Sequence, residues 1–341
     1  MKQNAGNYSV LWAAYFMAGF PLFYFVYKFG NPMFGTNDFF SYYKLYRDWD
    51  IANVEAPFNM RLLGSYIVYL INSTGLHYDT KTVFDQFGLD RNVFFNAVFF
   101  NYLCVVTTCV LIFRLVRTRL GGMMLPFLSG LLYFLGFGTI FYEIMPITDA
   151  LSVMLFAIVL SCYLARSYLI LIPLSLLIIQ REYVFMALGL VALLDFARRR
   201  DKYHLWVMVM CVFCFGVYYA LRKTVFYTPM YDHQASAGYF MESLLRINFP
   251  LGQYARQTLL TLNLYLIYLG VYFWKTWKGH VTDRAMFWNL FFLFLQINII
   301  SFAAVFGNNT GRYFYIVVPM VIYQLALELK PFLPEAALSG K

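Results

Sequence analysis

The chain has 341 residues, of which 61% are hydrophobic and only 13% are charged, against roughly 25% of charged residues in soluble domains. Several apolar stretches approach the roughly 20 residues that cross a hydrocarbon core about 30 Å thick. The formal net charge of +9 comes from short basic clusters between these stretches, a pattern that follows the positive-inside rule and argues against a nucleic-acid partner. We therefore expect an all-α, polytopic membrane helical bundle.

The apolar stretches predict about ten transmembrane helices in a single integral membrane domain that covers residues 1–341. In chain order, these helices are expected at residues 9–29, 92–113, 122–140, 149–165, 168–180, 183–196, 204–221, 255–274, 286–306 and 312–328. The first stretch follows one lysine and lacks a small-residue cleavage pattern, so it is predicted to be a membrane helix and not a removed signal peptide.

Residues 30–91 are expected to form an external loop with amphipathic, interfacial helices. Within this loop, residues 62–74 contain an apolar piece of only about a dozen residues, which suits an interfacial or re-entrant helix better than a full span. If this piece lies flat, the later basic clusters fall on one side of the membrane. We therefore predict a multi-pass protein of the cytoplasmic (inner) membrane with both termini in the cytoplasm; a spanning helix at 62–74 is the alternative.

The segment "DFFSYYKLYRDWD" opens this loop with an aromatic pattern. Phe39, Tyr42, Tyr43 and Tyr46 recur at spacings of three and four, which predicts one aromatic face of a short interfacial helix. Asp38 stands at the start of that helix, where a carboxylate caps free backbone N–H groups. Asp38 is therefore either a helix cap or a functional acid.

Two further acidic positions flank a proline in "FYEIMPITDALS". Glu143 and Asp149 lie on either side of Pro146, at the predicted outer end of two consecutive helices. A carboxylate close to hydrocarbon is costly unless it is paired, hydrated or capping, so both residues are functional candidates. Asp149 has the alternative role of capping the helix that follows.

Polar residues interrupt the apolar sequence again at "IIQREYVF". Gln180, Arg181 and Glu182 separate two short apolar pieces without a glycine or proline, which places them below the outer interface, facing a cavity. A plain structural pair between Arg181 and Glu182 is the alternative.

Basic residues near the later outer loops are candidates for holding an anion. Arginine binds phosphate through two parallel hydrogen bonds, and polyprenyl or phospholipid phosphates are the anions at this depth; contact with ordinary lipid headgroups is the alternative. The residues expected to bind substrate are Arg61, Asp149, Arg181, Glu182, Arg256 and Arg312. The four histidines are scattered, so no metal ligand is assigned, although carboxylates would suit Mg²⁺ or Mn²⁺ if a divalent cation takes part.

The arrangement of the chain resembles the GT-C superfamily of polyprenyl-linked glycosyltransferases. The shared features are an acid soon after the first membrane helix, a long first loop, a second acidic site and later basic residues. The segment "EAPFNMRLLGSYIVYLI" is also similar to a pattern of small bacterial membrane proteins grouped with it. The resemblance covers mainly residues 1–165. It implies that Asp38 is the catalytic base or a metal ligand, that Glu143, or else Asp149, is the second acid, and that Arg256 and Arg312 hold the lipid phosphate.

This resemblance implies transfer of a sugar from a polyprenyl-phosphate-linked donor to an acceptor at the outer face of the membrane. The partners would be the donor lipid, membrane lipids and other proteins of envelope biosynthesis. One departure concerns the tandem acids of some relatives, because Asn37 precedes Asp38 and Phe39 follows it.

Two other functions fit the composition. A transporter or flippase of a lipid-linked or anionic substrate would need polar residues through the membrane depth, for which Asn101, Gln296 and Asn298 are candidates. A non-catalytic membrane subunit of an envelope assembly would use the aromatic surface to bind partner helices.

Overall fold

The computed structural model contains helices joined by turns and loops, and no strands, over the part of the chain that it describes. That part comprises residues 2–29, 38–75, 89–136, 138–140, 145–229, 238, 251–305 and 310–332. The principal helices are α1 (Lys2–Phe29), α2 (Asp38–Asp48), α3 (Leu62–Ser73), α4 (Arg91–Leu120), α5 (Met124–Phe134), α6 (Asp149–Leu164), α7 (Leu171–Ile178), α8 (Tyr183–Arg199), α9 (Lys202–Thr224), α12 (Leu251–Trp277), α13 (Arg284–Val305) and α14 (Thr310–Leu329). Short 3₁₀ helices cover Phe58–Met60 (η1), Tyr168–Ile170 (η4) and Lys330–Phe332 (η5).

Each of the ten stretches predicted to be a membrane helix contains a helix. Four helical segments among the described residues are both long and apolar enough to cross a membrane: Tyr8–Lys28, Arg91–Leu120, Lys202–Thr224 and Tyr313–Phe332. Others, such as α5 and α7, are apolar but shorter. These four segments support a membrane protein of all-α class.

Local signals explain where several helices begin and end. Asp90 precedes α4 and accepts a hydrogen bond from the backbone N–H of Asn92 at 2.8 Å, and Asp201 caps α9 in the same way. Gly121 ends α4 with φ 72°, a left-handed conformation that glycine adopts without steric cost. Arg200 ends α8 in the same region of φ, so the chain reverses directly into α9.

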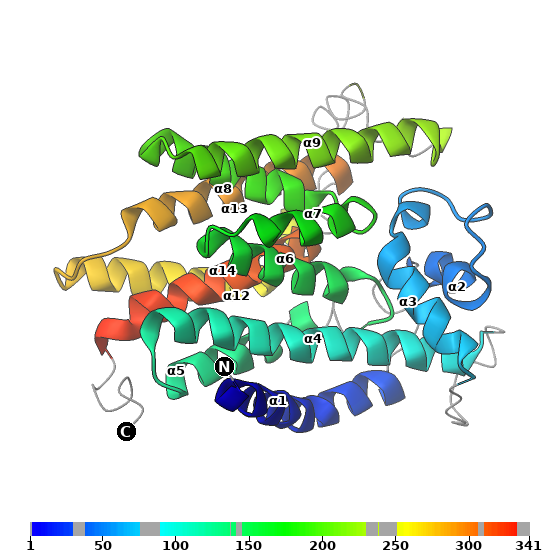
Figure 1. Cartoon of the computed structure of the whole chain (residues 1–341), viewed down its shortest axis with the longest axis horizontal. Coiled ribbons are helices and arrows are strands. Elements are labelled where there is room, and N and C mark those ends of the chain that lie inside the picture. Colours follow the sequence, from blue (N-terminus) through cyan, green and yellow to red (C-terminus); the bar gives the residue numbers. More distant parts are fainter. Residues whose placement is uncertain are drawn as a thin grey trace.

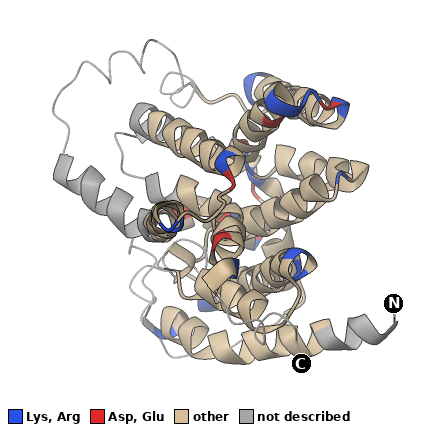
Figure 2. Ribbon diagram, turned by 90° about the vertical axis from the view of Figure 1, so that its left-hand side faces the viewer, with Lys and Arg blue, Asp and Glu red and all other residues tan. Residues whose placement is uncertain are grey.

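The long helices run roughly lengthwise, with α14 in the middle of the bundle (Figure 1). α14 contacts α4, α5, α6, α8, α12 and α13. One end, which we name the loop end, carries α2, α3 and the starts of α4, α6 and α8, and α3 runs steeply across the long helices there. The opposite end, which we name the basic end, carries the last turns of α4 and α8 and the start of α9. Figure 2 views the bundle from the basic end and shows Lys and Arg on several helix ends.

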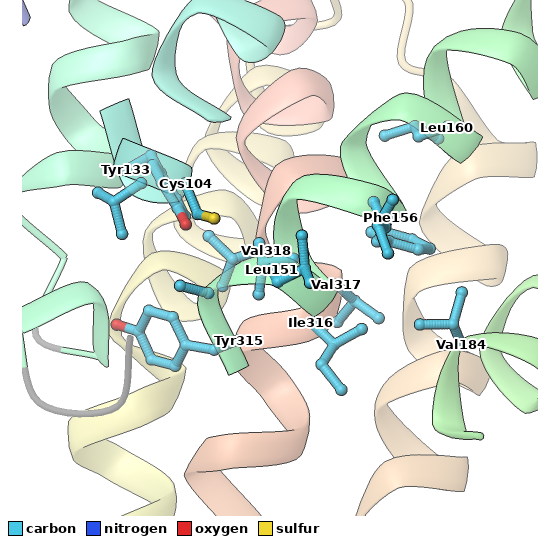
Figure 3. Packing of buried hydrophobic residues seen from close by; sticks show 14 of the residues in the cluster. Cys104, Tyr133, Leu151, Phe156, Leu160, Val184, Tyr315, Ile316, Val317 and Val318 are labelled. Carbon is cyan, nitrogen blue, oxygen red and sulfur yellow. The ribbon is translucent and has the colours of Figure 1, made fainter. Parts of the chain in front are cut away.

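A continuous apolar core separates the two ends. Figure 3 shows that side chains of α14 meet those of α4, α5, α6 and α8 in its centre. Phe156 on α6, Val184 on α8 and Val317 on α14 are all buried there. Among the described residues, the buried charged side chains gather in two separate regions, one at each end of the bundle.

Candidate functional site at the loop end

Helix α2 forms as predicted, with Asp38 as its first residue and its aromatic residues on one buried face. This face is buried against the protein and does not contact lipid, while the position of α2 at the membrane interface stays a prediction. Phe39 packs edge-to-face on Phe94 of α4, with ring centroids 5.5 Å apart, and the hydroxyl of Tyr43 accepts a hydrogen bond from the backbone N–H of Asp90 at 2.8 Å. The aromatic stripe thus fixes the first loop to the protein and holds Asp38 in place.

Arg61 lies between η1 and α3 and is only 7% exposed. Its Nη1 donates a hydrogen bond to the hydroxyl of Tyr42 at 2.7 Å, and its guanidinium lies 5.8 Å from the ring centroid of Phe58. The same Tyr42 oxygen accepts a hydrogen bond from Oγ1 of Thr148 at 3.2 Å. Tyr42 therefore links Arg61 of the first loop to the residue that precedes α6.

Gln180 joins three segments through its buried side-chain amide. Its Oε1 accepts from the backbone N–H of Gly64 in α3 at 3.0 Å. Its Nε2 donates to the carbonyl oxygen of Thr148 at 2.7 Å and to Oγ of Ser152 at 3.1 Å. This one side chain thus holds α3, α6 and the α7–α8 turn in fixed relation.

The neighbouring Arg181 forms an ion pair with Asp149, the first residue of α6, and both side chains are buried. The structure therefore pairs Arg181 with Asp149, whereas the sequence interpretation considered Glu182 as its partner. Thr148, not Asp149, occupies the N-cap position of α6, but its side chain accepts no hydrogen bond from the helix backbone. Its hydroxyl instead donates to Tyr42. The ion pair connects α6 to the α7–α8 turn.

Opposite charges surround Arg61. Its burial disfavours the positive charge, but Tyr42, Glu182 and Asp38 outweigh this effect and raise the pKa of Arg61 above its usual range. Glu182 is itself buried at the start of α8, and Asp38 is half-buried. The loop end thus holds a cationic side chain within electrostatic range of two carboxylates that come from distant parts of the chain.

A hollow of about 300 Å³ lies beside this group of charges, against the outer side of α2. Lys44 and Glu55 contribute charged side chains to its lining, and Phe58, which carries the Arg61 guanidinium on its ring, forms part of the wall. A small polar ligand in this hollow would therefore lie next to the charged residues of the first loop.

The structure brings together five of the predicted site residues: Asp38, Arg61, Asp149, Arg181 and Glu182. Glu143 lies outside the described residues. Arg256 and Arg312 belong to α12 and α14, but their side chains are also outside the described part of the chain. Sequence reasoning missed the hydrogen bonds of Tyr42, Thr148 and Gln180. The only signal for them was a polar side chain beside a proline turn or between apolar pieces.

Asn101, a candidate for a polar residue along a transport pathway, has a structural role instead. Its side-chain amide donates to the carbonyl oxygens of Met145 and Ile147, which flank Pro146. The hydroxyl of Tyr46 donates to the carbonyl oxygen of Pro146 at 3.3 Å. The turn before α6 is therefore held by side chains from α4 and α2.

A divalent cation fits the described residues of this site poorly. No three His, Cys, Asp or Glu side chains gather within the described ranges, and the charge of Arg61 already lies near both Asp38 and Glu182. A cation would also compete with the Asp149–Arg181 ion pair. No chemical step is therefore assigned to a metal.

Comparison with protein-family models, curated proteins and solved structures finds no match to this chain.

Proposed function

We propose that the chain is a membrane glycosyltransferase of the GT-C kind, which transfers a sugar from a polyprenyl-phosphate-linked donor to an acceptor hydroxyl. The observation that carries this proposal is the convergence of Asp38, Arg61 and Glu182 at one end of the bundle, held by the Tyr42, Gln180 and Asp149–Arg181 contacts. Acids and bases fixed on rigid helices satisfy the geometric demand of group transfer.

In this proposal Asp38 is the general base. Its carboxylate is half-buried at the N-terminus of α2, so it remains accessible to a hydroxyl group while the helix dipole stabilises its charged form. The acceptor oxygen would give its proton to Asp38 and form a bond to the anomeric carbon. The bond between that carbon and the phosphate oxygen would break, leaving the electron pair on the polyprenyl phosphate.

The leaving phosphate gains negative charge and needs a cation. Arg61 meets this need among the described side chains, since Arg181 is already paired with Asp149. Arg256 of α12 and Arg312 of α14 remain proposed contributors. Glu143 remains the proposed second acid.

The proposed topology places the loop end outside and the basic end in the cytoplasm, with about ten crossings of the cytoplasmic membrane. In support, the first helix begins and the last helix ends at the basic end (Figure 1), where the positive-inside rule places Lys and Arg. Thr74→Cys at the loop end is expected to react with a membrane-impermeant maleimide in intact cells, and Lys278→Cys at the basic end only after lysis. The reverse pattern would put the proposed chemistry on the wrong side.

Asp38→Asn tests the catalytic role directly. We expect transfer from a radiolabelled polyprenyl-phosphate sugar to fall by about a hundredfold or more, because general-base catalysis typically contributes that much. Asp48→Asn is the matched control, since Asp48 lies on the same helix but is exposed and paired with Arg47. Equal transfer by wild type and Asp38→Asn, with both proteins inserted normally, would remove the base and with it the proposal.

Transport of an anionic or lipid-linked substrate is the second candidate, because polar hollows lie at both ends of the bundle. The packed core between them, with Phe156, Val184 and Val317, argues against an open pathway (Figure 3). Uptake of labelled substrate into proteoliposomes, without formation of a transfer product, would favour transport.

A further inference from the structure

A polar cavity of about 480 Å³ lies at the basic end, across the core from the proposed catalytic site. Its walls come from the ends of α4, α6, α8 and α14, from the starts of α9 and α13, and from η5. The sequence interpretation treated the basic residues in these segments only as topology signals. Their side chains instead gather around one hollow.

The lining of this cavity favours an anion. Its basic side chains outnumber its acidic ones, Asp195 and Asp283, by two to one. The basic side chains are Arg119, Arg166, Arg199 and Lys330. Arg166 is already paired with Asp201 at 2.8 Å, so Arg119, Arg199 and Lys330 are the cations available to an anion. Moreover, Asp195 is already engaged, because it accepts hydrogen bonds from Tyr163 at 2.7 Å and from Nδ2 of Asn289 at 3.0 Å. Arginines in such a setting bind phosphate.

His204 belongs to the lining of the cavity and holds a buried hydrogen-bond acceptor without a partner among the described residues. Tyr163 donates its only hydroxyl proton to Asp195, so the contact of 3.0 Å between Tyr163 and Nδ1 of His204 requires the histidine to donate. In the neutral ring, Nε2 then carries a lone pair. This atom has no hydrogen-bond partner among the described residues, the carboxylate of Asp201 lying 3.9 Å away, although His204 is only 3% exposed.

Two amides of the cavity lining also hold buried acceptors without a partner among the described residues. Asn289 donates its Nδ2 to Asp195, and Gln324 donates its Nε2 to Glu328 at 2.9 Å, so a carboxylate fixes the orientation of each amide. Their oxygen atoms, Oδ1 and Oε1, have no partner within the described part of the chain, and both side chains are almost fully buried. Leaving a buried acceptor unsatisfied costs stability, which a hydroxyl donor would restore.

We propose that this cavity binds a phosphate ester that carries free hydroxyl groups. Arg119, Arg199 and Lys330 hold the phosphate, while the hydroxyls donate to His204, Asn289 and Gln324. Inorganic phosphate has no hydroxyl groups beyond those on its own phosphorus, and a simple amine-bearing headgroup lacks the set of hydroxyls. This site is independent of the proposed transfer reaction, since it lies at the other end of the bundle.

A second hollow, of about 530 Å³, adjoins this cavity and would suit an apolar chain. Arg119, Leu164 and Tyr323 belong to the walls of both, while Leu111 and Ile158 make the second hollow more apolar. The shared chemistry of the ligand, a phosphate with hydroxyls, can therefore come from a lipid headgroup or from a free sugar phosphate. The lipid source would use both hollows.

Binding to the full-length protein in phosphatidylcholine nanodiscs tests the proposal. Glucose 1-phosphate is compared with inorganic phosphate, and phosphatidylinositol with phosphatidylserine, by native mass spectrometry. We expect the hydroxyl-bearing member of at least one pair to bind about tenfold tighter, the gain expected from hydrogen bonds to buried acceptors. Preference for phosphatidylinositol alone would identify a lipid ligand, and preference for glucose 1-phosphate would identify the free ester. Equal binding within both pairs, or none, would overturn the proposal.

Two variants separate the phosphate from the hydroxyl contacts. Arg199→Gln should weaken the binding of every anion tested. Gln324→Leu should reduce only the preference for ligands that bear hydroxyl groups. Lys278→Gln is the control, because Lys278 belongs to the same end of the bundle but not to the cavity lining. If Lys278→Gln lost as much anion affinity as Arg199→Gln, the binding would be nonspecific surface attraction, and the site would be rejected. The comparison of ligands on the wild-type protein tests the proposal without any variant, so misfolding of a variant does not affect that test.

Discussion

Arg181 and Asp149 form an ion pair at a point where both side chains are buried, and the two residues belong to different segments that are 32 positions apart. Two charges removed from water in this way stabilise a structure only when each retains its partner. The pair therefore acts as a fixed junction between the start of α6 and the α7–α8 turn.

A double-mutant cycle on this pair should show strong coupling. Arg181→Met or Asp149→Asn alone should lower the free energy of unfolding by roughly 3–5 kcal/mol, because each leaves a buried polar or charged partner unpaired. The double variant should lose less than the sum of the two. Unfolding of the purified protein in mixed detergent micelles gives these values.

The exposed pair of Arg47 and Asp48, with side-chain exposures of 51% and 48%, is the control for this cycle. Its removal should cost less than about 1 kcal/mol. Additive effects of Arg181→Met and Asp149→Asn would contradict the assignment of the ion pair.

Gln180→Leu should disconnect three segments at once. The substitution leaves the buried N–H of Gly64 and the carbonyl of Thr148 without their partner, so we expect a loss of about 2 kcal/mol in unfolding free energy. Gln296→Leu removes one hydrogen bond, to Met186 at 3.2 Å, and should cost less than about 1 kcal/mol. If both variants unfold at the same detergent composition, Gln180 is not the junction described.

Gly130→Ala tests the close approach of α1, α4 and α5. A Cβ at this position would meet the hydroxyl end of Tyr15 and would lie 3.0 Å from the carbonyl oxygen of Cys109. Tyr15 cannot move freely, because it donates a hydrogen bond to the carbonyl oxygen of Phe127 at 2.9 Å. Overpacking of this kind costs about 1–3 kcal/mol, which a thermal shift in detergent should detect.

A glycine in open space provides the matched substitution. Gly216 lies on α9, and a Cβ at this position would have no neighbouring atom within 4 Å, so Gly216→Ala should be neutral or stabilising by up to about 1 kcal/mol. A thermal shift that is as unfavourable for Gly216→Ala as for Gly130→Ala would attribute the loss to something other than packing.

The cap of α9 should make stability depend on pH. The backbone N–H of Tyr203, with help from Arg166, lowers the pKa of Asp201 below its ordinary value of 3.8. The stabilisation is therefore complete above pH 3.8 and is lost as pH falls through the lower pKa of the folded protein. Asp201→Asn keeps a capping oxygen without the charge. The difference in stability between this variant and the wild type, followed by unfolding midpoints, should therefore change only in acid. A constant difference between the two at all pH values would argue against this linkage.

The helices were predictable from the sequence because apolar stretches and polar breaks are local signals. Even the stripe from Phe39 to Tyr46 is recognisable as one face of a helix. The burial of this stripe against α4 could not be predicted, because aromatic rings suit both a lipid interface and a protein interior. Only the position of Phe94 decides between them.

The contacts that form the two polar regions could not be predicted in the same way. The hydrogen bonds of Gln180 and the ion pair of Arg181 join residues that are far apart in sequence. A single sequence contains no signal that identifies the partner of either side chain. The cavity at the basic end was missed for another reason. Arg119 and Arg199 fit the positive-inside rule so well that their positions suggested no further role.

The hydrogen bonds from Asn101 to two backbone carbonyls have a consequence for the order in which the protein folds during synthesis. Asn101 belongs to α4, which leaves the ribosome well before Pro146 and the turn that this amide fixes. We therefore expect the turn to fold against a helix that has already been synthesised, so that the direction of translation favours assembly. A circular permutant that delivers residues 145–164 ahead of α4 would have to insert that segment without its template, and its yield in the membrane would report how much the native order matters.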